Sequence, residues 1–245
     1  MLKVQTDWKN QSYKDRIMVA LDCDKNRAYE LANILKGEAK WLKVGMTLFY
    51  SCGPAIVKDF KDMGFNIFVD LKLHDIPHQV QGAAYSITQA CADLFTIHAS
   101  GGFDMMQAAA GGALNAAQDC NCNIPDICAV TVLTSMNDEN LHSIGVERKA
   151  SDQVKLLARL VREASLSGII CSPQEAKDMR NLLGEDALIV TPGVRPKNAE
   201  LGDQSRVASP AQAFKAGASH IVVGRPITQS EDPLKAFKNI VEEIN

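Results

Sequence analysis

The run NIFVDLKL (66–73) places an aspartate and a lysine inside an otherwise apolar stretch. Asp70 and Lys72 are two residues apart, so in a β-strand both side chains would lie on the face that also carries Phe68. A carboxylate and an ammonium on a buried face are costly unless they are paired. The two residues could therefore form an ion pair that only stabilises the fold, or a charged pair that acts on a substrate, and by themselves they leave both interpretations open.

Two further charged residues end other apolar runs. Lys43 lies in WLKVG (41–45), and Asp22 ends IMVALD (17–22). Charges that were merely solvated would not all fall at the C-terminal ends of such runs. In a parallel barrel, polar residues at those ends are usually catalytic. We therefore expect these two residues to converge with the aspartate and lysine of the third run.

Asp75 does not fit the same pattern. It lies five residues after Asp70, on the opposite parity, and Pro77 restricts Ile76 to an extended conformation that ends the strand. The spacing alone leaves it as a loop, turn or helix-capping residue. His98, at the end of another apolar run, is as consistent with a structural hydrogen bond as with catalysis.

The elements that must position these residues alternate along the chain. Short runs rich in Ile and Val are typical of parallel strands covered on both faces, and they lie at 17–22, 41–45, 66–73, 94–99, 126–133, 167–172, 187–193 and 219–224. Helical patterns separate them, and the clearest are 25–36, 151–165 with Ser151 as N-cap, 209–217 opening at Ser209-Pro210, and 232–244 opening at Asp232-Pro233.

Eight strand–helix units predict an α/β fold, a (β/α)8 TIM barrel in a single domain over residues 1–245. A doubly wound sheet is the alternative, but no GxGxxG motif follows the first strand. Two long polar stretches, 134–150 and 192–207, follow the fifth and seventh strands, at the end where a barrel carries its active site.

Composition excludes several classes of protein. A net charge of −3 gives no electrostatic basis for binding nucleic acid or an anionic membrane surface. The polar N-terminus is not a secretory signal, and no apolar run reaches the roughly 18 residues of a membrane span. The seven cysteines form no Cys-x-x-Cys pair and the histidines no ligand pattern, so we expect free thiols, no metal site and a cytoplasmic location.

The run VDLKLHDIP (69–77) resembles the signature Asp-x-Lys-x-x-Asp-Ile-Pro of the orotidine 5′-phosphate decarboxylase family. Asp-x-Lys-x-x-Asp alone is moderately specific, because related sugar-phosphate lyases share it. The resemblance covers essentially the whole chain, and the chain is similar to the bacterial branch of the family. The other segments that match are ALD (20–22), LKVG (42–45), TIHASGG (96–102), VTVLTSM (130–136), VTPGVRP (190–196), Gly202, Asp203, Gln204, Arg206, Val207 and IVVGRPIT (221–228).

The resemblance implies an activity, which is decarboxylation of orotidine 5′-monophosphate (OMP) to uridine 5′-monophosphate (UMP), the last step of de novo pyrimidine biosynthesis. It implies no cofactor and no metal. Lys72 would protonate carbon 6 of the pyrimidine within an alternating array of Lys43, Asp70, Lys72 and Asp75. Asp75 would reach into the site of a neighbouring subunit, which implies a homodimer.

The resemblance also implies a set of residues that bind the substrate. Asp22 and Lys43 would hold ribose hydroxyls, and Thr134 would contact the pyrimidine edge. The phosphate would be held by Gln204, Gly224 and Arg225, with Arg195 nearby, and Ile76 and Pro192 complete the set. Gln79 is a departure, because the family usually has Thr there, contacting ribose from the partner subunit.

The chemistry is consistent with these residue types. Loss of the carboxylate leaves a carbanion with no adjacent carbonyl to delocalise it, and the sequence offers no recognisable site for a cofactor that would act as electron sink. The remaining option is to stabilise the carbanion with a fixed cation beside that carbon. Lys72 is suited to this role, because flanking carboxylates favour the charged form of a lysine. Asp70 would either repel the substrate carboxylate or simply orient Lys72. The stretch 192–207 is the expected closing loop.

Three alternatives remain open from sequence. A keto-gulonate- or hexulose-phosphate lyase shares Asp-x-Lys-x-x-Asp but needs a divalent metal and usually has Glu in place of Lys43. A phosphoribosyl isomerase would share the barrel and the phosphate site but not the Asp70–Lys72 pair. The third alternative is a barrel that binds a nucleotide without catalysis. Binding alone would not favour the Asp70 carboxylate beside the carboxylate of the ligand.

Overall fold

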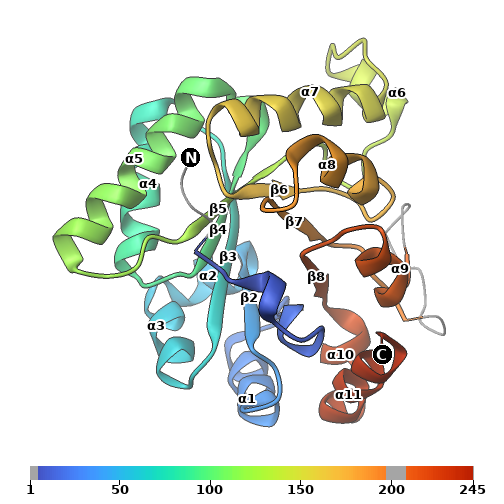
Figure 1. Ribbon diagram of the computed structural model, residues 1–245. Helices are drawn as coiled ribbons and strands as arrows, with labels where there is room; N and C mark the ends of the chain where they lie inside the picture. The colour runs from blue at the N-terminus through green and yellow to red at the C-terminus, as the bar shows by residue number, and fades with distance from the viewer. Residues whose placement is uncertain (1–4, 197–207, 245) are drawn as a thin grey trace.

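The computed structural model describes residues 5–196 and 208–244, and within them it shows a closed barrel of parallel strands in sequential order (Figure 1). The strands are β1 (Ile17–Ala20), β2 (Trp41–Gly45), β3 (Asn66–Leu73), β4 (Leu94–His98), β5 (Asp126–Val130), β6 (Gly168–Ile170), β7 (Leu188–Thr191) and β8 (His220–Val223). The predicted (β/α)8 fold is confirmed, and the alternative of a doubly wound sheet is wrong because β8 pairs with β1.

Helices surround the strands on the outside (Figure 1). They are α1 (Lys25–Leu35), α2 (Met46–Cys52), α3 (Ala55–Asp62), α4 (Pro77–Gln89), α5 (Gly102–Cys120), α6 (Asp138–Ser143), α7 (Ala150–Glu163), α8 (Ala176–Leu183), α9 (Pro210–Lys215), α10 (Arg225–Thr228) and α11 (Pro233–Ile244), with short 3-10 turns at Trp8–Asn10, Lys14–Arg16 and Ala99–Gly101. None of the helices in the described residues is long and apolar enough to cross a membrane.

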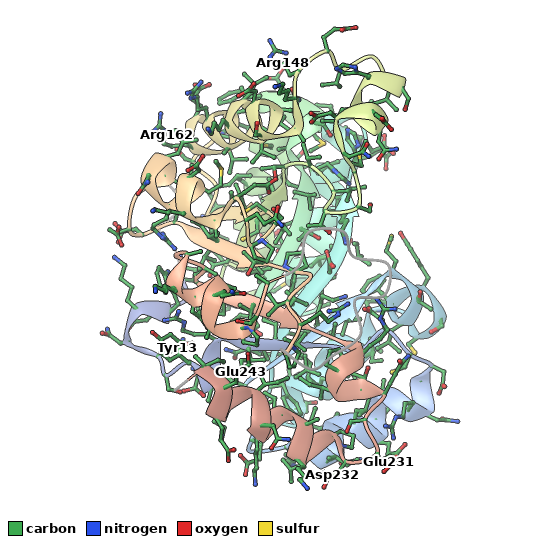
Figure 2. All side chains as sticks on the ribbon, turned by 90° about the vertical axis from the view of Figure 1, so that its right-hand side faces the viewer. Tyr13, Arg148, Arg162, Glu231, Asp232 and Glu243 are labelled. Atoms are coloured by element: carbon green, nitrogen blue, oxygen red, sulfur yellow. The ribbon has the colours of Figure 1, made fainter. Side chains whose placement is uncertain are left out.

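Side chains at the helix starts explain where several helices begin. Ser209 caps α9 through a capping box with Gln212, as predicted. Asp232, on the surface at the start of α11 (Figure 2), accepts a hydrogen bond from the Lys235 N–H at 2.9 Å.

The predicted N-cap at Ser151 is wrong. The helix α7 already begins at Ala150, so Ser151 lies inside its first turn. The N–H of Ala150 donates to the carboxylate of Asp138, on α6, at 2.7 Å. A side chain twelve residues upstream therefore provides the cap, and a local pattern does not reveal such a partner.

Two apolar layers hold the barrel together. Phe68 and Trp41 lie in the cluster that fills its interior, while Ile67 and Val69 face the helices, as the strand alternation predicts. The N-terminal segment lies across one end of the barrel (Figure 1), and Trp8 packs against the interior cluster there. The opposite end, where the strands terminate, is therefore the one left free for a site.

Candidate active site

A cavity of about 530 Å³ opens at the C-terminal ends of the strands. This volume is in the range that holds a small ligand. Four charged side chains from the first three strand ends, Asp22, Lys43, Asp70 and Lys72, all line it. The structure thus brings together the four residues that the strand-end pattern expected to converge.

These four residues form a chain of alternating charge. The Nζ of Lys43 lies 3.0 Å from Oδ1 of Asp22 and 3.6 Å from Oδ2 of Asp70. The Nζ of Lys72 lies 2.9 Å from Oδ1 of Asp70. The exposed fraction of the side chain is 13% for Asp70 and 26% for Lys72, against 65% for Asp22. The exposed fraction of Lys43 is 9%, so Lys43 and Asp70 are the most shielded members of the chain, and electrostatic interactions are strongest there.

The strand β3 is irregular where Asp70 and Lys72 meet. Phe68 pairs with Leu94 and Val69 with Phe95, but the next pair is Leu73 with Ile97, so residues 70–72 lie opposite Thr96 alone. Lys72 also has a φ of 53°, in the left-handed region that L-residues adopt at a cost of roughly 1–2 kcal/mol. The two side chains lie together, as expected from the sequence, but within a bulge and not in a regularly alternating strand.

Thr96 is the residue of the site that the sequence-based prediction missed. Its hydroxyl donates to Oδ1 of Asp70 at 2.8 Å and accepts the backbone N–H of Lys72 at 3.0 Å. It is completely buried. A signal was present, since Thr96 is a polar residue between Leu94 and His98 on one face of an apolar run, but only the register with β3 shows what it contacts.

Asp70 stays ionised although it is buried. Burial alone would raise the pKa of its carboxyl group, but the charges of Lys43 and Lys72 and hydrogen bonds from Lys72 and Thr96 together lower it below the ordinary 3.8. A carboxylate held in this state keeps an opposite charge beside Lys72 throughout the neutral pH range.

Gly45 leaves the space that the charged chain occupies. A Cβ at this position would lie 2.9 Å from Oδ1 of Asp22 and 3.0 Å from Nζ of Lys43. Any larger residue would therefore separate Lys43 from Asp22, which explains glycine at the end of β2.

The cavity is also lined by five more of the predicted substrate-binding residues. Thr134, Pro192, Arg195, Gly224 and Arg225 all line it. The backbone N–H of Arg195 donates to the carbonyl of Ala208 at 3.0 Å, which fixes the end of β7 against the segment before α9. The predicted phosphate ligand Gln204, and most of the expected closing loop, lie outside the described residues.

Three predicted site residues lie away from the cavity of their own chain. Asp75, Ile76 and Gln79 are exposed and do not line it. The Asp75 carboxylate accepts the backbone N–H of Ile76 at 2.7 Å, and Ile76 is 63% exposed. Among the described residues of one chain, the charged array therefore ends at Lys72.

His98 lies behind the charged chain. Burial lowers the pKa of its imidazole below 6.5, and the nearby His74 and Lys72 lower it further. Its ring centroid is 5.2 Å from that of His74. His98 does not line the cavity, so its geometry supports a structural role better than contact with a substrate.

Comparison with known proteins decides the family. Residues 15–240 match the model described as the "Orotidine 5'-phosphate decarboxylase / HUMPS family". The chain belongs to this family. The resemblance drawn from the motifs is thereby confirmed, over nearly the whole sequence.

Individual members of the family are similar over the same length. The orotidine 5′-phosphate decarboxylase of Moorella thermoacetica is 45% identical over 233 residues, which is 94% of this chain and 92% of that protein. The protein of the same name from Shewanella sediminis is 44% identical, over 94% of this chain and 97% of its own.

Solved structures agree. The crystal structure of orotidine 5′-phosphate decarboxylase from Lactobacillus acidophilus matches with a TM-score of 0.83 and 35% identity, covering 94% of this chain and 99% of that one. An uncharacterised conserved protein from Geobacillus kaustophilus matches with a TM-score of 0.81 and 34% identity, covering 94% and 100%.

Proposed function

We propose that this chain decarboxylates OMP to UMP and so carries out the last step of de novo UMP synthesis. The observation that carries the proposal is the alternating chain Asp22–Lys43–Asp70–Lys72 in the cavity of a member of this family. Relatives at 44–45% identity bear the name of this activity.

Lys72 is proposed to supply the chemistry without a cofactor. The bond between carbon 6 and the carboxylate breaks, its electron pair stays on carbon 6, and carbon dioxide leaves. The Lys72 ammonium stabilises the negative charge that develops and then donates a proton to carbon 6, and the amine regains a proton from water. The Asp70 carboxylate, 2.9 Å from Nζ, places a negative charge beside this ammonium and orients it.

The contacts of Asp70 support an orienting role. Its Oδ1 interacts with Lys72 and Thr96, and its Oδ2 lies 3.6 Å from Lys43. A carboxylate held by three partners is fixed in position and fixes Lys72 in turn. Repulsion of the substrate carboxylate is the second contribution we consider, and it operates only when the substrate places its carboxylate beside Asp70.

The rest of the cavity is proposed to bind the nucleotide. Asp22 and Lys43 would hold the ribose, and Thr134 the pyrimidine edge. Gln204, Gly224 and Arg225, with Arg195 nearby, would bind the phosphate, and Pro192 would complete the set of substrate-binding residues. Binding energy from the phosphate, remote from carbon 6, would position the reacting end of the substrate.

A homodimer would complete the site. We propose that Asp75, with Ile76 and Gln79, enters the cavity of a partner subunit and extends the charged array beyond Lys72. Exposure of residues 74–79 supports this, as does the large apolar side chain of Ile76 at the surface. Phe103, 45% exposed just after the turn Ala99–Gly101, would add apolar area to the same interface.

A metal-dependent sugar-phosphate lyase is the second candidate, since the family description also includes HUMPS. Lys43 argues against it. Its ammonium lies between the carboxylates of Asp22 and Asp70, at 3.0 and 3.6 Å, and so occupies the position where those two carboxylates would share a divalent cation.

The loss of OMP absorbance, followed with EDTA present, tests the proposal. We expect the protein to turn over OMP in EDTA. In a parallel assay with magnesium, we expect it to leave 3-keto-gulonate 6-phosphate unchanged. Turnover of the sugar phosphate only, and only with metal, would support the second candidate. Tight UMP binding without turnover of either compound would indicate a barrel that binds nucleotides and catalyses nothing.

A further inference from the structure

The bulge in β3 leaves part of the β3–β4 pairing to a side chain. Between the pairs Val69–Phe95 and Leu73–Ile97, residues 70–72 have only Thr96 opposite them. The Lys72 N–H donates to the Thr96 hydroxyl at 3.0 Å, within the stretch where the register of the two strands is interrupted. The side chain of Thr96 thus serves as a hydrogen-bond acceptor for the bulged backbone at the centre of the site.

From these contacts we propose that Thr96 is a positioning residue, which holds Asp70 and Lys72 in their reacting geometry. The inference rests on the proposed decarboxylation for its catalytic consequence, but its geometric content can be measured without turnover. Neither the signature motif nor the family resemblance assigns this residue a role.

Three hydrogen bonds close a ring through Thr96. Its hydroxyl accepts from the Lys72 backbone and donates to Oδ1 of Asp70 at 2.8 Å, and the same Oδ1 accepts from Nζ of Lys72 at 2.9 Å. Lys72 is therefore held at both ends, at its backbone by Thr96 and at its ammonium by Asp70. A hydroxyl has one donor and two acceptor sites, so it can serve both partners at once.

The backbone of Lys72 needs this support. Its φ of 53° is unfavourable for a residue with a Cβ, and such a conformation persists only where surrounding contacts impose it. Without an acceptor for its N–H, Lys72 would gain by relaxing toward an ordinary strand conformation. That movement would carry its ammonium away from Asp70 and from the proposed position of carbon 6.

The ionisation of Asp70 gives a readout that a merely structural threonine would not change. Asp70 faces Lys43 from β2, Lys72 on its own strand and His98 from β4, with Asp22 beyond Lys43. Thr96 adds an uncharged donor to these groups. Removing that donor destabilises the carboxylate form, so the pKa of Asp70 must rise.

The experiment compares Thr96→Val, which keeps the shape but loses the hydroxyl, with Thr96→Ser, which keeps the hydroxyl. For Thr96→Val we expect kcat for OMP to fall roughly 10- to 100-fold, the range for a lost hydrogen bond to a charged group. KM should change little, and the acidic limb of the pH profile of kcat should move to higher pH. Thr96→Ser should restore both values close to wild type.

Carbon-13 NMR titration of the Asp70 carboxyl group supplies the measurement that does not need turnover. We expect a higher pKa in Thr96→Val than in wild type and in Thr96→Ser. If Thr96→Val does not fold, Thr96→Cys, which offers only a weak donor, should show a smaller shift in the same direction.

The outcomes separate the two proposals. Unchanged kcat, pH profile and Asp70 titration in Thr96→Val would overturn the role of Thr96 while leaving OMP decarboxylation intact. Wild-type protein that does not turn over OMP, together with a raised Asp70 pKa in the valine variant, would refute the proposed function and support the positioning role.

Discussion

Lys72 acts in this account as a cation whose position and charge are both fixed by neighbours. Asp70 pairs with it at 2.9 Å, and Lys43 lies on the other side of Asp70 at 3.6 Å. Each charge in the chain has an opposite charge beside it, which offsets the cost of shielding them from water. An ammonium that is already oriented needs no reorganisation when negative charge appears on the substrate.

Asp70→Asn tests the carboxylate at the residue scale. The amide keeps the size of the side chain but removes the negative charge beside Lys72, so we predict a fall in kcat of roughly 100-fold. Steady-state kinetics with OMP, together with the dissociation constant of UMP, checks this. Full activity in the asparagine variant would remove Asp70 from both the orienting and the repelling role.

At the scale of elements, the strand ends position the charges and the caps fix where helices begin. Strand periodicity and strand-end polarity predicted the barrel and the convergence of Asp22, Lys43, Asp70 and Lys72. The bulge at residues 70–72 and the contact with Thr96 were not predictable, because the register between β3 and β4 depends on packing between distant segments. The capping of Ala150 by Asp138 was missed for the same reason.

Capping gives a matched pair of variants. Ser209→Ala removes the hydroxyl that accepts the Gln212 N–H at the start of α9 and should lower the free energy of unfolding by about 1 kcal/mol. Ser151→Ala, within the first turn of α7, should change it by less than about 0.5 kcal/mol. Urea denaturation of the two variants would contradict the cap assignments if Ser151→Ala cost as much as Ser209→Ala.

At the scale of the whole molecule, the barrel buries groups whose ionisation couples folding to pH. His220 begins β8, is completely buried, and packs edge-on against Trp41 with ring centroids 5.6 Å apart. Burial, and then the charges of Arg16 and Lys40, lowers the pKa of its imidazole from 6.5 to about 3. The native state therefore keeps His220 neutral where the unfolded chain binds a proton.

The sign of the pH effect follows from this difference. The contribution of His220 to stability is fully present above pH 6.5 and is lost progressively as the pH falls from 6.5 toward about 3. His220→Gln, which cannot bind the proton, should show a shallower loss of stability over that window. Urea midpoints from pH 7 to pH 4 for both proteins check this, and equal slopes would contradict it.

The proposed dimer predicts complementation between two defective chains. If Lys72 of one subunit works with Asp75 of its partner, a mixed dimer of Lys72→Ala and Asp75→Asn chains contains one site with both defects and one intact site. Random reassociation should then restore about a quarter of wild-type activity, because half the dimers are mixed. Each variant reassociated alone is the control, and no recovery in the mixture would place both residues in one chain's site.

The turnover of OMP by Lys72→Ala beside wild type, with UMP binding measured for both, is the decisive test of the role of Lys72. We expect kcat to fall by roughly 10⁴-fold or more, because the variant loses both the cation and the proton donor. UMP should still bind, since the phosphate and ribose contacts come from other strands. Decarboxylation at near wild-type rate by a folded Lys72→Ala protein that binds UMP would show that Lys72 is not the proton donor.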